Sequence, residues 1–208
     1  LYNYQYQINF IMKFKISFIA SLFSFLLYAQ TAPSYYSSIN FNNPKTQLKA
    51  DLASLITTTH TKVISYSELK TLLAQSDVDP ENANNLLLIY GSESSGTHTR
   101  SRSKNGSWNR EHVYAKSKGT PNLGTSGPGA DGHHLRPADV TLNSTRGSLL
   151  FDDGTGTKAY KTSRGGWYPG EEWKGDVARI IMYMYLRYDK RCLPLNITFG
   201  PSTYSSDL

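Results

Sequence analysis

The segment from Trp173 to Tyr188 constrains the fold more than any other part of the sequence. It reads W-K-G-D-V-A-R-I-I-M-Y-M-Y-L-R-Y, which predicts a helix that is apolar almost all round. Such a helix has to be covered by other elements, so we expect it at the centre of the core. The single cysteine, Cys192, excludes an internal disulfide and a cysteine-rich zinc site. Stability must therefore come from this core or from a bound metal.

Two further helices are expected before this one. Asn43 and Pro44 are suited to begin the first, and leucines then recur at helical spacing to about His60. The second begins near Ser65, where S-Y-S-E has the capping-box pattern, and an Asp-Pro pair ends it. Short strand patterns and glycine-rich loops separate these helices from the central one. This order of elements predicts an α+β fold in one domain.

Three segments have strand character. The run N-L-L-L-I-Y-G at 85–91 predicts a buried strand, E-H-V-Y at 111–114 predicts a second, and H-H-L-R-P at 133–137 is extended before its proline. A short helix is expected from Pro137 towards Arg146. Between the last two strands, the glycine- and proline-rich segment 119–132 is long enough to indicate a functional loop.

The N-terminal region has the pattern of a secretory signal. Met12 is followed by two lysines and by an apolar run that is too short for a comfortable membrane span. We therefore expect an upstream, non-native extension at 1–11, a signal peptide at 12–30, a linker at 31–43 and one domain at 44–208. A protein released in this way has no stable membrane association. A retained N-terminal anchor is the alternative.

The charge of the chain favours a polyanionic partner. The formal net charge is +6 and the sequence pI is about 9.3. Basic residues cluster around the second predicted strand, and they are the candidates for a phosphate-contacting surface: Arg100, Arg102, Lys104, Arg110, Lys116 and Lys118.

Glu111 and His112 are neighbours in a predicted strand, so they should face opposite sides and serve different partners. Asn143 and Arg146 are three apart on a predicted helix and should share one face. Carboxylate and amide oxygens are ligands that Mg²⁺ accepts, with Ca²⁺ or Mn²⁺ as alternatives. A neutral histidine can activate water, and an arginine can neutralise a phosphate. These residue types predict a hydrolytic metal site for a phosphodiester.

Four motifs occur in a fixed order: E-H-V-Y at 111, D-G-H-H-L-R-P at 131, N-S-T-R-G at 143 and G-D-V-A-R at 175. Together they resemble the bacterial endonuclease I family, which are secreted or periplasmic nucleases of the His-Me finger (ββα-metal) type. The resemblance implies a mainly helical domain, with short strands and long loops, around that motif. In it, a strand ends at His112, a loop follows, a second strand lies near 134–136, and a helix carries Asn143.

The resemblance also implies roles for individual residues. Glu111 and Asn143 match the metal ligands, and His112 matches the general base. Beyond these matches, we expect Arg146 to be a catalytic residue that contacts phosphate, with a snorkelling or helix-capping arginine as the alternative. Three residues are expected to orient the site or to stabilise it: Asp131, His133 and Arg179. For Arg179, which lies in the apolar helix, we expect burial with an ion-pair partner or a phosphate.

The implied function is a secreted, metal-dependent and sequence-non-specific endonuclease that acts on DNA, with RNA as a second candidate substrate, as a monomer. Family members continue beyond the position at which this sequence ends, so the resemblance also predicts a C-terminally truncated domain. Some family members carry a further active-site arginine in the loop after the Glu-His pair, and the segment 119–132 of this sequence has no clear counterpart of it.

Two other functions remain open at this point. One is a non-catalytic nucleic-acid-binding module that uses the basic residues, whose binding would depend on salt but not on metal. The other is a zinc hydrolase built on three histidines, although their spacing matches no strong zinc motif: His112, His133 and His134.

Overall fold

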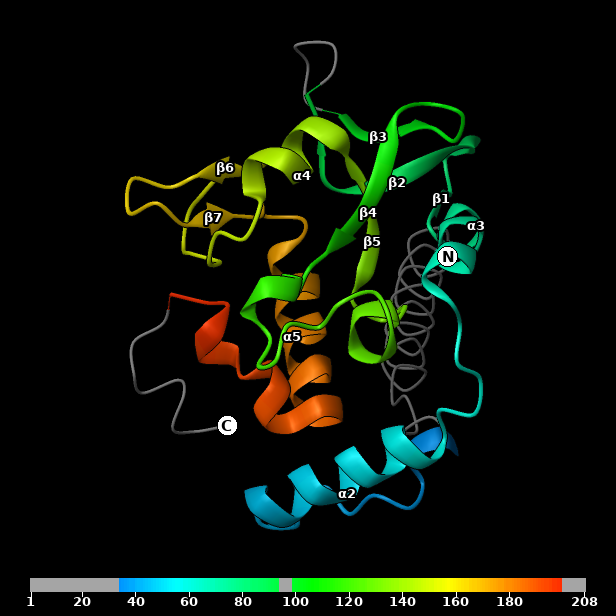
Figure 1. Cartoon of the computed structure of the whole chain (residues 1–208), viewed down its shortest axis with the longest axis vertical. Coiled ribbons are helices and arrows are strands. Elements are labelled where there is room, and N and C mark those ends of the chain that lie inside the picture. The colour runs from blue at the N-terminus through cyan, green and yellow to red at the C-terminus, as the bar shows by residue number, and fades with distance from the viewer. Residues whose placement is uncertain (1–33, 94–98, 200–208) are drawn as a thin grey trace, which may run out of the picture. The chain divides into compact units, whose positions relative to one another are not determined.

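The computed structural model describes residues 34–93 and 99–199 (Figure 1). The expected extension and signal peptide, and the start of the linker, lie outside these residues. The chain divides into two units, Leu1–Asn43 and Pro44–Leu208. In the first, the described residues form the 3-10 turn η1 (Ser34–Tyr36) and a turn closed by the Asn40 side chain, which donates to Asn43 Oδ1 at 3.0 Å.

The second unit is an α+β domain, as predicted from the order of elements. Its described helices are α2 (Lys45–Thr58), α3 (Tyr66–Ser76), α4 (Val140–Arg146) and α5 (Lys174–Tyr188). A five-stranded sheet contains β1 (Val78–Asp79), β2 (Asn82–Ser92), β3 (Thr99–Ser103), β4 (Trp108–His112) and β5 (Leu135–Asp139). A hairpin consists of β6 (Tyr160–Lys161) and β7 (Trp167–Tyr168). Four 3-10 turns complete it: η2 (Lys116–Lys118), η3 (Gly127–Ala130), η4 (Asp189–Cys192) and η5 (Pro194–Asn196).

The sheet is mixed and places β4 at the end of its main path. The strand order is β1-β2-β5-β4, and β3 pairs with β2 beside this path. Strands β2 and β5 are parallel, whereas the other pairs are antiparallel. In the β4–β5 pair, Glu111 lies opposite Arg136 and His112 lies opposite Leu135. Helix α4 follows β5 directly and runs beside β4 (Figure 1).

Helix α5 lies in the larger of two hydrophobic cores, but the prediction that it is apolar almost all round is wrong. Its buried stripe consists of Val177, Ile180, Ile181 and Met184. Arg179 points away from this stripe, its side chain is 74% exposed, and it pairs with Asp176 at 2.6 Å. The expected burial of Arg179 is therefore also wrong, because this position falls on the solvent side of the helix.

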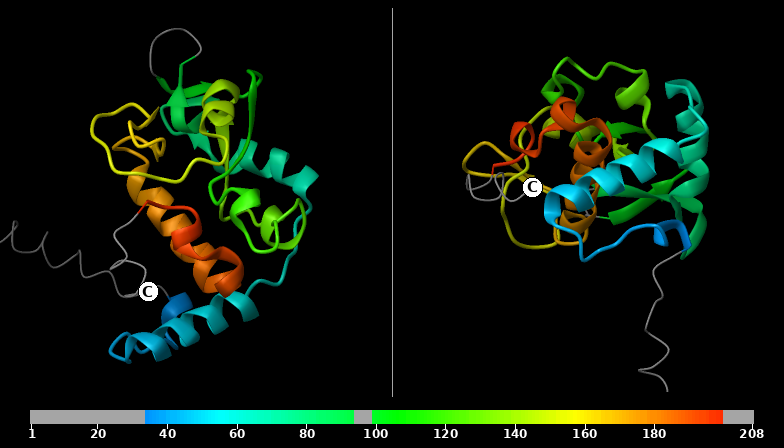
Figure 2. Two further views of the ribbon diagram at one scale, coloured as in Figure 1. Left: turned by 60° about the vertical axis from the view of Figure 1, so that its left-hand side comes forward. Right: turned by 90° about the horizontal axis from the view of Figure 1, so that it is seen from below.

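Helix α2 packs across the C-terminal end of α5, as Figures 1 and 2 show from three directions. Lys49 of α2 donates to the Tyr185 hydroxyl and to Asp189 Oδ1. The helix begins one residue later than predicted, since Pro44 occupies its N-cap position. Among the residues that the structure describes, no helix has the length and apolar character needed to cross a membrane.

The helix expected from Pro137 begins only at Val140. Pro137 lies in β5 instead, and Asp139 is the N-cap of α4, with Oδ1 accepting from the backbone N–H groups of Thr141 and Leu142. The strand expected at 111–114 covers 108–112. The polar segment before it contains β3, which no sequence pattern predicted, because T-R-S-R-S pairs with β2 at the sheet margin without any apolar alternation.

The capping box of α3 is confirmed and can be tested. Ser65 Oγ accepts from the Glu68 backbone N–H, and Glu68 Oε2 accepts from the Ser65 backbone N–H. We expect Ser65→Ala to lower the free energy of unfolding by about 1 kcal/mol, which lowers Tm by about 2–4 °C for a chain of this size. Thermal melts measure this shift. Ser54→Ala, at an exposed position inside α2, is the control, and an equal loss there would contradict the role of the cap.

Candidate active site

Glu111 and His112 end strand β4 and contact different elements, as strand alternation predicts. The Glu111 carboxylate meets Tyr90 of β2 and Arg146 of α4. The His112 ring lies against Tyr66 of α3, with ring centroids 5.4 Å apart, and bonds to Gly129 of η3. The chain therefore brings one carboxylate and one imidazole to the same end of β4, each held from its own side.

Arg146 is a buried partner of Glu111. Its Nη1 lies 3.0 Å from Glu111 Oε1, and the two side chains are 0% and 2% exposed. The same guanidinium donates to the backbone carbonyls of His112 (2.9 Å) and Val113 (2.8 Å). Burial raises the pKa of Glu111, and the Arg146 charge opposes that shift. The expected contact of Arg146 with phosphate does not fit this placement, because the side chain has no exposed surface.

The hydrogen bond of His112 defines its tautomer. Nε2 lies 2.9 Å from the Gly129 carbonyl oxygen, which can only accept, so Nε2 carries the proton and Nδ1 keeps its lone pair. Burial lowers the pKa of His112 to about 4, and the charges of Lys116 and Arg110 act in the same direction. The ring is therefore neutral at neutral pH, with a basic nitrogen in a defined orientation.

Asn143 lies beside these residues on α4. Its Nδ2 donates to Asn109 Oδ1 at 2.6 Å and, more weakly, to the Arg110 carbonyl at 3.4 Å. Both contacts use the NH₂ group, so they orient the amide and occupy none of the lone pairs of its carbonyl oxygen. Asn143 and Arg146 both reach β4 from one face of α4, as their spacing predicts.

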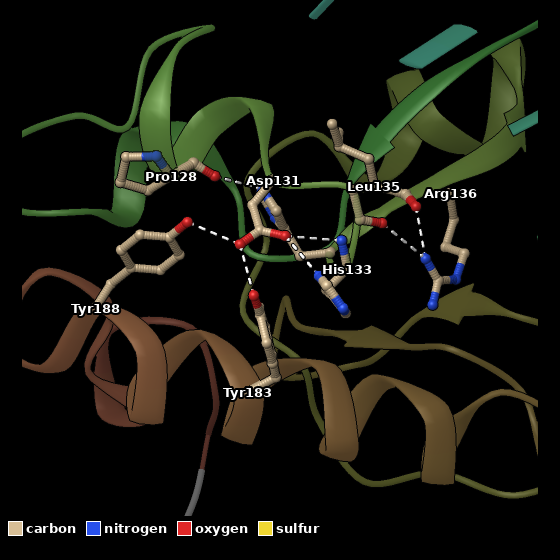
Figure 3. A network of polar contacts seen from close by, with 9 residues as sticks. Pro128, Asp131, His133, Leu135, Arg136, Tyr183 and Tyr188 are labelled. Carbon is tan, nitrogen blue, oxygen red and sulfur yellow. Dashed lines mark hydrogen bonds and ion pairs between the residues drawn. The ribbon is translucent and has the colours of Figure 1, made fainter. Parts of the chain in front are cut away.

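Asp131 is the centre of a polar network that joins the loop before β5 to α5 (Figure 3). Its Oδ1 accepts from the backbone N–H and the Nδ1 of His133, each at 2.9 Å. Its Oδ2 accepts from the hydroxyls of Tyr183 (2.8 Å) and Tyr188 (2.7 Å). Burial alone would raise the pKa of Asp131, but these hydrogen bonds together hold it well below its usual range. The network anchors the loop that carries the Gly129 carbonyl.

The three histidines that a zinc site would need do not converge. His133 is stacked on Tyr183, with ring centroids 4.3 Å apart, and His134 Nε2 bonds to the Pro128 carbonyl at 2.8 Å. Burial lowers the pKa of His134 to about 3, so it is neutral. Within 34–93 and 99–199, three His, Cys, Asp or Glu side chains nowhere gather as a metal-binding group. The ligand pair predicted from the sequence, Glu111 and Asn143, is not a group of this type, because one of its two members is an asparagine.

Several of the basic residues that were predicted to contact phosphate form contacts within the protein instead. Arg100 pairs with Glu172 at 3.2 Å, and Arg102 pairs with Asp139 at 3.0 Å. Arg110 lies over the Tyr66 ring, 3.8 Å from its centroid. The three lysines of the predicted surface, in the turn after β3 and in η2, are half-buried: Lys104, Lys116 and Lys118.

Three contacts of this site were not predicted from the sequence. Tyr66, which stacks on His112, lies inside the capping-box pattern of α3. Tyr90, which binds Glu111, lies in the apolar run at 85–91, and its hydroxyl among aliphatic residues was the only sequence signal of a polar contact. Gly129 contributes only a backbone carbonyl, which no residue pattern reveals.

Comparison with known families places the chain among nucleases. The sequence model of endonuclease I matches residues 44–207, so the chain belongs to the endonuclease I family. The predicted resemblance is thereby confirmed.

Two curated relatives carry the name extracellular ribonuclease. The one from Bacillus amyloliquefaciens is 48% identical over 155 residues, which covers 69% of this chain and 50% of the relative. The one from Bacillus subtilis (strain 168) is 48% identical over 155 residues, covering 68% and 49%. The chain thus spans about half the length of these relatives. No solved structure matches it.

The burial of the Glu111–Arg146 pair leads to a prediction about stability. We expect Arg146→Met to lower the free energy of unfolding by about 3–5 kcal/mol, because it leaves a buried carboxylate without its counter-charge. Arg179→Met, which removes the exposed pair with Asp176, should cost about 0–1 kcal/mol. Urea denaturation of both variants measures the difference. An equal loss of stability in the two variants would show that the buried pair stabilises the protein no more than the exposed pair does.

The Asp131 network leads to a prediction about pH. We expect Asp131→Asn to lower the free energy of unfolding by about 2–3 kcal/mol at neutral pH. Since the pKa of Asp131 is depressed in the folded chain, its stabilisation is complete above the unfolded value, about 4, and is lost as pH falls through the folded value. The difference in free energy of unfolding between wild type and variant should therefore become smaller below about pH 4.

Denaturation curves between neutral and strongly acidic pH measure that gap. Asp153→Asn, at an exposed position, is the control and should show no gap at any pH. A gap for Asp131→Asn that stays constant down to about pH 2 would contradict the linkage.

Proposed function

We propose that this chain is an extracellular, metal-dependent endonuclease that hydrolyses phosphodiester bonds without sequence specificity. The observation that carries the proposal is the placement of two oxygen donors, Glu111 and Asn143, beside a neutral His112 of defined tautomer. The relatives' name supports RNA as a substrate and an extracellular location. DNA is the second substrate that we propose. The signal peptide at 12–30, the linker at 31–43, the nuclease domain at 44–208 and the monomeric state are part of the same proposal.

The donor set fits a divalent cation that prefers oxygen. Tyr90 and Arg146 both bind Oε1 of Glu111, so Oε2 is the atom that we assign to the metal. The amide of Asn143 is turned so that its Oδ1 is the second ligand. A site with two protein oxygens suits Mg²⁺, which keeps waters and substrate phosphate in its other positions, and Ca²⁺ or Mn²⁺ could replace it. When bound, the metal polarises the phosphate and stabilises charge on the leaving oxygen.

Strand β4, strand β5 and helix α4 are the elements that we assign to the ββα-metal motif. They follow one another in the chain, β4 and β5 pair antiparallel, and the helix contributes Asn143. The strand ends with the Glu-His pair, and the loop between the strands returns the Gly129 carbonyl to the histidine. This arrangement supports the finer prediction drawn from the family resemblance.

In the proposed reaction, Nδ1 of His112 accepts a proton from the attacking water. The water oxygen forms a bond to phosphorus, and the leaving oxygen departs with the electron pair of the broken P–O bond. The bond from Nε2 to Gly129 holds the ring throughout, because both nitrogens are donors in the protonated imidazole. Arg146 contributes to this step indirectly: it holds the Glu111 carboxylate and the backbone carbonyls of His112 and Val113 in place.

Cleavage assays on the purified full chain test the proposal. With Mg²⁺, we expect nicking of supercoiled plasmid and degradation of single-stranded RNA, and EDTA should abolish both. His112→Ala should lower the rate by about 10²–10⁴-fold, the usual contribution of a general base. Asn143→Ala should instead raise the Mg²⁺ concentration that half-maximal activity requires. His60→Ala is the control and should retain activity, because His60 follows α2 and its ring lies near that of His133, with centroids 6.5 Å apart, on the side of the Asp131 network away from the proposed ligands.

The outcomes separate the candidate functions. A folded chain that binds nucleic acid in a salt-dependent way but cuts neither substrate would support the non-catalytic binding module. Cutting that resists EDTA, or that survives His112→Ala, would overturn the proposed mechanism.

A further inference from the structure

Tyr90 has a backbone conformation that side chains of its kind rarely adopt. Its φ is 72°, in the left-handed region, and among the described non-glycine residues only Asp189 shares a positive φ. Gly91, with φ 79°, follows directly, and the register of β2 is irregular between Leu87 and Ser92. A bulky aromatic residue in this region is strained and persists only where surrounding contacts impose it.

The contacts of the Tyr90 side chain show what the strained backbone achieves. The ring is completely buried and lies against Trp167 and Phe151, at centroid distances of 5.4 and 6.4 Å. The hydroxyl donates to Glu111 Oε1 at 2.9 Å. A phenol is protonated at neutral pH and the carboxylate oxygen can only accept, so the hydroxyl is the donor.

We propose that Tyr90 is a positioning residue for the metal-binding carboxylate of Glu111. Its hydroxyl and the Arg146 guanidinium bind the same oxygen, Oε1, from two different elements. Two donors on one oxygen restrict rotation of the carboxylate and direct Oε2 towards the metal. This inference rests on the proposed function, since it concerns the orientation of a proposed ligand.

A purely structural tyrosine would not need this arrangement. Tyr114 is also fully buried, and its hydroxyl is satisfied by the Leu193 backbone carbonyl at 2.9 Å, with no strained backbone. The Tyr90 hydroxyl instead donates a hydrogen bond to a carboxylate that already has an arginine as its counter-charge. A phenylalanine would fill the same space, so the hydroxyl is the part of Tyr90 that the proposal concerns.

The test compares Tyr90→Phe with Tyr168→Phe. Tyr168 is the matched control, because it is equally buried and its hydroxyl also donates to a carboxylate, Glu171 Oε2 at 3.0 Å, outside the site. Electron paramagnetic resonance measures Mn²⁺ binding to each full chain in the absence of substrate. Cleavage assays then give kcat at saturating metal and KM for the nucleic acid.

We expect Tyr90→Phe to weaken Mn²⁺ binding about tenfold, which corresponds to about 1.4 kcal/mol. Its kcat should fall while KM stays within about twofold, because the hydroxyl acts on the metal ligand and not on the substrate. Tyr168→Phe should bind Mn²⁺ like the wild type. Tyr90→Phe binding equal to that of Tyr168→Phe would overturn the inference. Tighter binding would do so too, since it would show that the hydroxyl competes with the metal.

Two further comparisons keep the inference testable. If Tyr90→Phe does not fold, 4-fluorophenylalanine at position 90, which fills the space of the hydroxyl but cannot donate, replaces it, and unchanged Mn²⁺ binding would then refute the inference. If the wild type cuts with Mg²⁺ and both tyrosine variants match it, the positioning role fails while the proposed function stands. A wild type that neither binds Mn²⁺ nor cuts would remove the proposed function and this inference with it.

Discussion

The arrangement of the site depends on one buried ion pair. Arg146 neutralises Glu111 at a position where both side chains are almost completely buried, and it also binds two backbone carbonyls at the end of β4. A charged carboxylate is costly to bury unless a counter-charge or several hydrogen bonds compensate for the lost water. The pair therefore explains why α4 follows β5 so closely and why its last turn faces β4.

The second requirement is a fixed imidazole, and a different part of the chain meets it. The loop between β4 and β5 returns to His112 and presents the Gly129 carbonyl, while the Asp131 network fastens that loop to α5. The central helix, which contributes no residue to the proposed chemistry, thus helps to hold the loop that orients the base through two tyrosines, Tyr183 and Tyr188.

The sequence predicted elements best where local signals are strong. The Ser65 capping box and the class of the fold are confirmed, since both follow from short patterns. Burial of single residues is harder to predict, because it depends on which face of a helix meets the core. For this reason Arg179, in a helix that looked apolar, is exposed, whereas Arg146, in a short polar helix, is fully buried. Contacts such as Gly129 to His112 depend on the path of a loop, which sequence periodicity does not describe.

Helix α4 also lies beside the edge of the sheet that β4 forms (Figure 1). Strand β4 ends the main path, so its outward carbonyls could pair with a strand from another molecule. Asn143 binds the carbonyl of Arg110, and Arg146 binds that of His112, which are alternate residues and so face the same side. The helix that carries a proposed metal ligand therefore also protects this edge from aggregation by strand addition.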